Sequence, residues 1–122
     1  MNEVIKSTTE SDIKKLIEDR LTIARSQGKL LYFRLNAGMT VLEDKGVRRV
    51  IKGQPTGTSD FLVLIPTRYP TQGLFRVVFI EAKRPHGGKQ SDAQKAFQKE
   101  VESIGAEYFI VKSYEDLEGV LR

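Results

Sequence analysis

The sequence predicts an α/β domain in which a central mixed β-sheet is flanked by helices. Three observations lead to this fold class. Apolar residues recur at helical spacing in the segments 7–27 and 91–104. Short runs of aromatic and β-branched residues lie between and after these segments, and they predict strands. The chain has 122 residues, of which 39% are hydrophobic and 30% charged, so it fits a single domain covering residues 1–122.

The first elements are expected to be a helix and a strand. A helix over residues 7–27 follows from its apolar stripe, and Gly28 can end it. The run LLYFRL, residues 30–35, predicts a strand, which Asn36-Ala37-Gly38 breaks. The stripe of the helix consists of Ile13, Leu16, Ile17, Leu21 and Ala24.

A hairpin is expected next, over residues 40–43 and 47–52, around the turn Asp44-Lys45-Gly46. A loop rich in Gly, Pro and Thr separates it from two apolar strands, over residues 60–65 and 74–83. Within the second of these strands, the apolar residues have the character of a buried interior. They are Val77, Val78, Phe79, Ile80 and Ala82.

The last third of the chain predicts a helix, a strand and a closing helix. The helix covers residues 91–104 and stops at Gly105. The strand covers residues 107–111, and the closing helix covers residues 113–121. One face of the first helix is expected to be buried, with Phe97, Val101 and Ile104 on it.

Composition excludes several classes of protein. The chain has no cysteine, so disulfides, thiolate zinc sites and cysteine nucleophiles are excluded, and a reducing cytoplasm is the expected location. A single histidine, His86, argues against a histidine metal site or a Ser-His-Asp triad. No apolar run approaches the length of a membrane span, and the polar N-terminus does not resemble a signal peptide. The net charge of +4 is compatible with a polyanionic partner.

Charged residues at the end of the second apolar strand carry the first functional signal. Glu81 and Lys83 lie there, although charged side chains are rarely buried unless they are paired or bind a metal. If the two strands form a hairpin around residues 66–73, Asp60 faces Glu81 across the pair. Lys83 projects to the same face as Glu81, because side chains alternate along a strand. The pattern therefore predicts two carboxylates and an ammonium at one end of the hairpin.

These residue types suit metal-assisted hydrolysis of a phosphodiester. Hard divalent cations bind through oxygen, commonly through one or two carboxylates together with water and substrate phosphate. Such a metal lowers the pKa of its bound water and neutralises charge on the phosphate. A lysine beside the metal can contact a phosphate oxygen or the attacking water.

Six short motifs follow one another in order over nearly the whole chain. They are Thr9-Glu10-Ser11, Asn36-Ala37-Gly38, Gly57-Thr58-Ser59-Asp60, Ile80-Glu81-Ala82-Lys83-Arg84-Pro85, Gly88-Lys89-Gln90-Ser91 and Gln94-Lys95-Ala96-Phe97. The set resembles the PD-(D/E)XK nuclease superfamily and, within it, the VRR-NUC family of virus-type replication-repair nucleases. A Glu-x-Lys motif alone is common, whereas the ordered set is specific. One departure is that the nominal Pro-Asp pair of the superfamily is Ser59-Asp60 here.

The resemblance implies a restriction-endonuclease-like core with a Mg²⁺ or Mn²⁺ site. Asp60 and Glu81 are then the metal ligands, and the backbone carbonyl of Ala82 is a further ligand. Lys83 orients the water or stabilises the phosphate. Each has an ordinary alternative: Asp60 could terminate the preceding loop by accepting backbone N–H groups, and Glu81 with Lys83 could be a half-solvated pair. The expected opposition of Asp60 and Glu81 favours the site.

Glu10 and Gln94 complete the site that the resemblance implies. Glu10 approaches the metal, directly or through water, and Gln94 supports the site from its helix. Both residues also fit capping boxes, Glu10 with Ser7 as N-cap and Gln94 with Ser91 as N-cap. Each lies on the apolar stripe of its helix as well, so both interpretations stay open at this point.

Basic residues could form a surface that contacts phosphates, although a solvated charged face is the simpler interpretation for each one alone. Arg84 and Lys89 are favoured because their loop directly follows the site. The full set is Arg34, Arg48, Arg49, Lys52, Arg84, Lys89 and Lys95. His86 is interpreted as a loop residue, and Tyr69, Tyr108 and Tyr114 as packing residues.

The function expected from these features is a metal-dependent DNA endonuclease in phage-type replication, recombination or repair. Stand-alone members of the family are thought to be dimers, so a homodimer that cuts branched DNA, such as a four-way junction or flap, is expected. A restriction-type enzyme is less favoured, because no separate element for reading bases is evident. The alternative is a non-catalytic nucleic-acid-binding module of a replication assembly, and a replication or repair protein could be a partner in either case.

Overall fold

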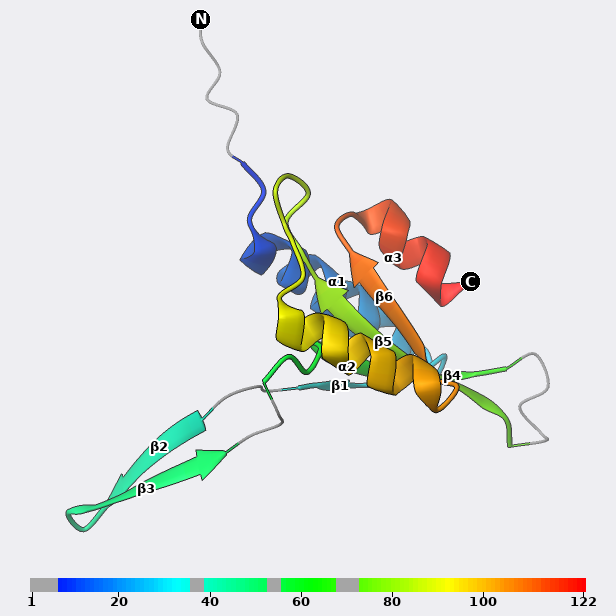
Figure 1. The fold of residues 1–122 in the computed structure, drawn as a ribbon. Coiled ribbons are helices and arrows are strands. Elements are labelled where there is room, and N and C mark those ends of the chain that lie inside the picture. The colour runs from blue at the N-terminus through cyan, green and yellow to red at the C-terminus, as the bar shows by residue number, and fades with distance from the viewer. Residues whose placement is uncertain (1–6, 36–38, 53–55, 68–72) are drawn as a thin grey trace, which may run out of the picture.

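The computed structural model describes residues 7–35, 39–52, 56–67 and 73–122 (Figure 1). Among these residues, β1, β4, β5 and β6 form a four-stranded sheet in the order β1-β4-β5-β6, and β2 pairs with β3 in a separate hairpin. The elements are α1 (Glu10–Ser26), β1 (Leu31–Arg34), β2 (Met39–Asp44), β3 (Val47–Lys52), β4 (Phe61–Pro66), β5 (Phe75–Ala82), α2 (Asp92–Ser103), β6 (Glu107–Val111) and α3 (Tyr114–Leu121). The β5–β6 pair is parallel and the other pairs are antiparallel, which confirms the predicted mixed sheet.

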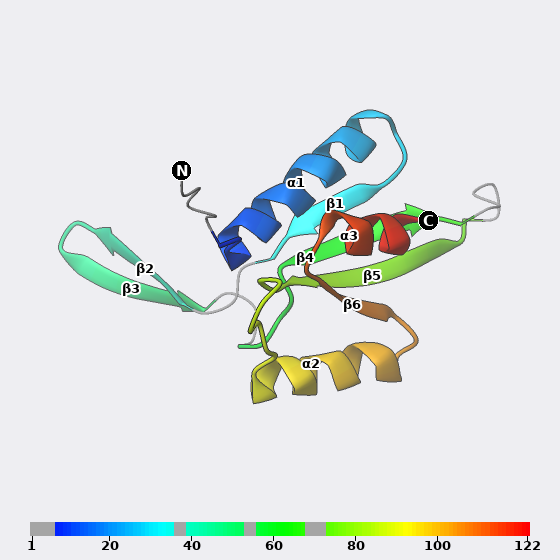
Figure 2. The same cartoon turned by 90° about the horizontal axis from the view of Figure 1, so that it is seen from above.

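Helices cover both faces of the four-stranded sheet. Figure 2 shows α1 on one side and α2 on the other, with the strands between them. The apolar stripe of α1 packs with α3 on the first face, and the predicted stripe residues are buried or partly buried there. Side chains such as Ile17, Leu21, Phe61, Ile80 and Leu117 have no exposed surface. Burying each side chain of this size contributes about 1.5–3 kcal/mol, so this layer holds the sheet against α1 and α3.

The register of β4 and β5 agrees with the prediction. The paired positions run from Phe61 opposite Ile80 to Pro66 opposite Phe75. Buried and partly buried residues alternate along β4, as expected for a strand with one face against the α1 core. Asp60 directly precedes Phe61, and Glu81 directly follows Ile80, so the two carboxylates lie next to each other at this end of the pair.

Three packing predictions are wrong. The Val77 side chain is 38% exposed, Ile104 is 80% exposed and Tyr114 is 49% exposed. Val77 lies on the part of the sheet face that α2 leaves uncovered, while Phe79 farther along β5 meets Phe97 of α2. Ile104 is the C-cap residue of α2 and therefore lies beyond the buried stripe, which Val101 ends. Tyr108 is buried, as expected.

The predicted hairpin is present as β2 and β3. Its two-residue turn consists of Lys45 and Gly46, with φ angles of 52° and 78°. Positive φ at both turn residues is the geometry of a type I′ turn, which suits the twist of two-stranded hairpins. Figures 1 and 2 both show the hairpin extending away from the four-stranded sheet. None of the helices in the described ranges is long and apolar enough to cross a membrane.

Candidate active site

Backbone contacts fix Asp60 at the start of β4. One carboxylate oxygen, Oδ2, accepts a hydrogen bond from the N–H of Ala82 at 2.8 Å, and the backbone carbonyl accepts from the N–H of Leu35 at 2.8 Å. The alternative role for Asp60, hydrogen bonding of a backbone N–H, is thus present. The donor, however, belongs to β5 and not to the loop before β4. Asp60 is therefore held beside Glu81.

The loop before Asp60 depends on a glycine. Gly57 has a φ angle of 92°, and a Cβ atom placed there would come 2.4 Å from the backbone oxygen of Ala93 in α2. Only glycine accommodates both conditions, because side chains disfavour positive φ and the neighbouring backbone cannot move aside. After it, Ser59 is 1% exposed, so the segment enters the core directly before Asp60.

Glu81 is a buried carboxylate with an incomplete set of partners. Its side chain is almost fully buried, and the residue is 3% exposed. One oxygen, Oε1, accepts a hydrogen bond from Gln94 Nε2 at 3.0 Å, whereas the other, Oε2, is buried and has no hydrogen-bond partner in the part of the chain that the structure describes. Burial and then the charge of Asp60 raise the pKa of Glu81 to about 8, although Lys83 opposes the increase.

Gln94 has both of the roles that the sequence left open. Ser91 is the N-cap of α2, its hydroxyl accepts from the N–H of Gln94, and Gln94 Oε1 accepts from the N–H of Ser91 at 2.9 Å. The Nε2 group of the same amide donates to Glu81. The capping box therefore fixes the orientation of the amide group that supports Glu81.

Glu10 is not a capping residue, which excludes the alternative of a capping box with Ser7. The N-cap of α1 is Thr9, and Asp12 is its partner in the capping box. Since α1 begins at Glu10, the Glu10 carboxylate is available for other contacts. Its Oε1 lies 3.6 Å from Lys83 Nζ, and its Oε2 lies 3.5 Å from Lys14 Nζ. The structure thus brings Glu10 to the same cluster as Asp60 and Glu81.

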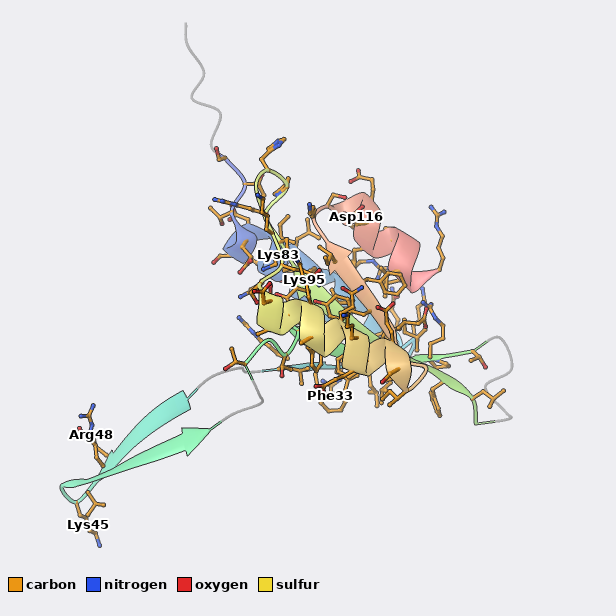
Figure 3. All side chains as sticks on the ribbon, viewed as in Figure 1. Phe33, Lys45, Arg48, Lys83, Lys95 and Asp116 are labelled. Atoms are coloured by element: carbon orange, nitrogen blue, oxygen red, sulfur yellow. The ribbon has the colours of Figure 1, made fainter. Side chains whose placement is uncertain are left out.

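Lys83 is a buried ammonium between two carboxylates. It is 8% exposed, and its Nζ lies 4.0 Å from Glu81 Oε1 as well as 3.6 Å from Glu10. The backbone N–H of Lys83 donates to the carbonyl of Val111 at 3.1 Å, which extends the β5–β6 pairing past the end of β5. In Figure 3 its side chain lies near the N-terminal ends of α1 and α2.

Sequence reasoning missed Lys14, which also belongs to this cluster. Its Nζ lies 3.4 Å from Asp60 Oδ1, in addition to its contact with Glu10. Partial burial alone would lower the pKa of Lys14, but Asp60 and Glu10 outweigh this effect and the pKa is raised. The available signal was its spacing of four residues from Glu10, which places both side chains on one face of α1.

An open cavity of about 550 Å³ adjoins Lys83 and Glu10. The loop after β5 forms one wall, and the start of α1 forms the other. Gly88 lets this loop turn tightly, since a Cβ atom there would come 2.6 Å from the carbonyl oxygen of Arg84. The lining residues are Thr9, Glu10, Ser11, Lys83, Arg84, Gly87, Gly88 and Lys89. Three cationic side chains and two hydroxyls make this cavity suitable for a phosphate-bearing ligand.

The remaining basic residues are spread over the molecule. Arg34 on β1 pairs with Glu18 at 3.0 Å, and Lys95 is exposed on α2. Arg48 pairs with Glu43 at 3.5 Å on the hairpin, and Figure 3 shows Arg48 and Lys45 far from Lys83. The exposed His86 lies in the loop after β5, as expected. The side chains of Arg49 and Lys52, together with Asn36-Ala37-Gly38 and Tyr69, lie outside the described part of the chain.

The donor atoms fit a small hard cation with incomplete protein coordination. Within the described residues, no three His, Asp or Glu side chains are arranged to hold a metal ion. Asp60 and Glu81 supply two carboxyl groups, however, and Glu81 Oε2 has no hydrogen-bond partner among the described residues, so a cation can bind it in place of the proton. Mg²⁺ commonly binds one or two carboxylates and keeps several waters, so a third acidic side chain is not required.

Comparison with known proteins adds no relative: no protein-family model matches the chain, and no curated protein matches it either. A function for the chain is therefore inferred from the residues of the site.

Proposed function

We propose that the protein is a metal-dependent DNA endonuclease with a PD-(D/E)XK core related to the VRR-NUC family. The observation that carries the proposal is the buried Glu81 carboxylate. When Glu81 is ionised, its Oε2 atom has no hydrogen-bond donor among the described residues, and the Glu81 side chain lies beside a second carboxyl group, Asp60, with which it can share a proton. Such an arrangement is costly in a protein unless the carboxyl group keeps a proton or a cation binds to it. An adjacent cavity with cationic walls supports a phosphodiester substrate.

Five residues of the site have defined roles in this proposal. Asp60 and Glu81 hold Mg²⁺ or Mn²⁺, and the carbonyl of Ala82 is a candidate for a further ligand. The metal, when bound, supplies an activated water and neutralises charge on the phosphate. Lys83 lies close enough to Glu81 to contact the same phosphate or water, and Gln94 keeps the Glu81 carboxylate oriented.

DNA contacts are proposed at two places. Arg84 and Lys89 line the cavity beside Lys83, so they are placed to bind the phosphates that flank the cleaved bond. The hairpin presents Arg48 away from the site, and with Arg34 it would extend the basic surface along a longer DNA segment. Specific DNA interfaces bury about 1,000–2,500 Å² of protein surface, which is a large area for one domain of this size.

A homodimer would double this surface and present two sites to branched DNA. The structure has an uncovered apolar area that suits a second copy of the chain. It lies where α2 does not reach the sheet, and a groove of about 370 Å³ there includes Leu31, Leu64, Phe75 and Val77 in its lining. Exposed apolar areas of this kind mark protein interfaces. We propose a homodimer through this area, acting in the cytoplasm with a replication or repair protein as a further partner.

Cleavage of labelled DNA tests the proposed function. Four-way junction, flap, single-stranded and linear duplex substrates are incubated with Mg²⁺, Mn²⁺ or EDTA, and Asp60→Ala and Lys83→Ala are compared with wild type. The proposal expects metal-dependent cutting that both substitutions abolish, with DNA binding retained by Lys83→Ala. Tight binding without cutting of any substrate would instead favour a non-catalytic nucleic-acid-binding module.

A further inference from the structure

The ammonium group of Lys14 lies against one oxygen of the proposed metal ligand Asp60. The Asp60 carboxylate uses Oδ2 to accept the Ala82 N–H at 2.8 Å, and its other oxygen, Oδ1, lies 3.4 Å from Lys14 Nζ. Lys14 thus covers the Asp60 oxygen that does not accept the Ala82 N–H. A metal ion shared by Asp60 and Glu81 needs oxygen from both carboxylates, so the ammonium and the metal compete for Asp60.

The charges around Lys14 show why an ammonium is needed there. Glu10, Asp60 and Glu81 bring three carboxyl groups together, and among the described residues Lys14 and Lys83 supply the ammonium groups that contact them. Each lysine joins Glu10 to one of the other two carboxylates. Carboxylates at such short range repel one another unless positive charge lies between them.

The side chains of Lys14 and Lys83 differ in how easily they can move away from the carboxylates that they contact. The Lys83 side chain is 10% exposed, whereas the Lys14 side chain is 31% exposed. Lys14 also borders a second cavity, of about 360 Å³, along the outer side of α1. Glu18 lines that cavity one helical turn beyond Lys14, so a displaced ammonium would reach water and another carboxylate without crossing the core.

We propose that Lys14 is a displaceable counter-ion of the candidate metal site. Its ammonium balances Asp60 until a divalent cation binds, and it leaves Asp60 when the cation takes its place. Lys14 therefore sets the metal concentration at which the site fills. This inference rests on the proposed function, because it requires that Asp60 binds a metal.

A simple structural role makes a different prediction. If Lys14 only ties α1 to the start of β4, its removal lowers stability and leaves metal affinity unchanged. If it is a counter-ion, its removal takes away a competitor and strengthens metal binding. Metal affinity, measured without DNA, separates the two roles independently of cleavage.

Calorimetric titration of the full chain with Mn²⁺ provides the test. Lys14→Met keeps the length of the side chain and removes its charge, and Lys14→Arg keeps the charge. We expect Lys14→Met to lower the Kd for Mn²⁺ roughly five- to tenfold, the change that corresponds to the loss of one partly buried ion pair. Lys14→Arg should bind Mn²⁺ no more tightly than wild type.

Lys15→Met is the matched control, since Lys15 is the exposed neighbour of Lys14 and carries the same charge. Removal of the Lys15 charge should change the Kd for Mn²⁺ by less than about twofold at physiological salt, where exposed charges are screened. Thermal melting in EDTA verifies that each variant is folded. An equal or higher Kd for Lys14→Met would overturn the counter-ion role alone. Absence of Mn²⁺ binding by the folded wild-type protein would overturn both this inference and the proposed metal site.

Discussion

Replacement of Glu81 by glutamine should stabilise the protein at neutral pH when no divalent cation is present. The Glu81 carboxyl group is 3% exposed, and burial together with Asp60 raises its pKa from 4.5 to about 8. A group with a raised pKa in the folded state binds its proton more tightly there than in the unfolded chain. Its contribution to stability is therefore complete below pH 4.5 and is lost as the pH rises towards 8.

The size of the effect follows from the two pKa values. At pH 7 the folded protein keeps a proton on Glu81 that the unfolded chain has released. The free energy is about 1.4 kcal/mol per pH unit between 4.5 and 7, which amounts to roughly 3 kcal/mol. Glutamine carries no ionisable proton and can still accept the hydrogen bond from Gln94. Its amide group can also donate towards Asp60.

Urea unfolding in EDTA at several pH values measures this difference. The free energy of unfolding of Glu81→Gln should equal that of wild type near pH 4 and exceed it by about 3 kcal/mol at pH 7. Mn²⁺ should then stabilise wild type and leave the variant unchanged, because ligands stabilise only the state that binds them. The exposed Glu100→Gln change on α2 is the control. A difference between Glu81→Gln and wild type that does not vary with pH would refute the reasoning.

Three further predictions concern the packing at the site and at the proposed dimer groove. Gln94→Ala should lower the free energy of unfolding by about 1–2 kcal/mol, because it removes half of a capping box and the amide partner of Glu81. Urea unfolding measures this loss, and the neighbouring Lys95→Ala is the control. A loss no larger than that of Lys95→Ala would contradict the prediction. Gly57→Ala should lower the free energy of unfolding by on the order of 1–3 kcal/mol, because the residue has a positive φ and lies against α2. Gly119→Ala, where a Cβ atom would meet no neighbouring atom, should leave the free energy of unfolding unchanged or raise it, since alanine favours helix. A loss of stability in both variants would contradict this prediction. Phe75→Glu should shift a wild-type dimer to monomer in sedimentation, and a wild-type protein that sediments only as monomer would rule out the proposed interface.

The strand pair at the site could be predicted from the sequence for a physical reason. Both strands are apolar and are separated by a turn region, so the register that buries one face of each is strongly favoured. That register brings Asp60 next to Glu81, and the observed pairing of β4 with β5 agrees with it. The position of Lys83 followed from the alternation of side chains along β5, and the distance of 4.0 Å to Glu81 agrees with this position.

Other parts of the site depended on choices that the local sequence leaves open. Ser7, Thr8 and Thr9 are all suitable N-caps, so the pattern alone could not show that α1 begins at Glu10 and that its carboxylate turns to the site. Lys14 has an ordinary helical spacing from Glu10, and its contact with Asp60 depends on how α1 lies across the sheet. The spacing of apolar residues identified the helix and could not identify this tertiary contact.

The exposed side chains of the second sheet face have a similar explanation. Val77 and Ile104 are apolar and exposed, and they line one groove at the end of α2 together with Phe75. Helix α2 ends at Ser103, however; it packs along β6, and its Phe97 ring contacts Phe79 of β5. Hydrophobicity predicts that such residues prefer burial, but it does not predict whether they are buried by residues of the same chain or by another chain. We propose that a second copy of the chain buries these residues in the dimer.

Single-turnover cleavage by Asp60→Asn tests whether a metal ion held by Asp60 and Glu81 carries out the cleavage. Asparagine retains an oxygen that can accept the Ala82 N–H, so the fold at the start of β4 should persist while the negative charge on the proposed metal ligand is lost. On the substrate that wild type cuts best in Mg²⁺, we expect Asp60→Asn to lose at least about two orders of magnitude in rate, with DNA binding unchanged, and EDTA to abolish wild-type cutting. Asp60→Asn that cuts at the wild-type rate, or wild type that cuts equally well in EDTA, would contradict a metal held by Asp60 and Glu81.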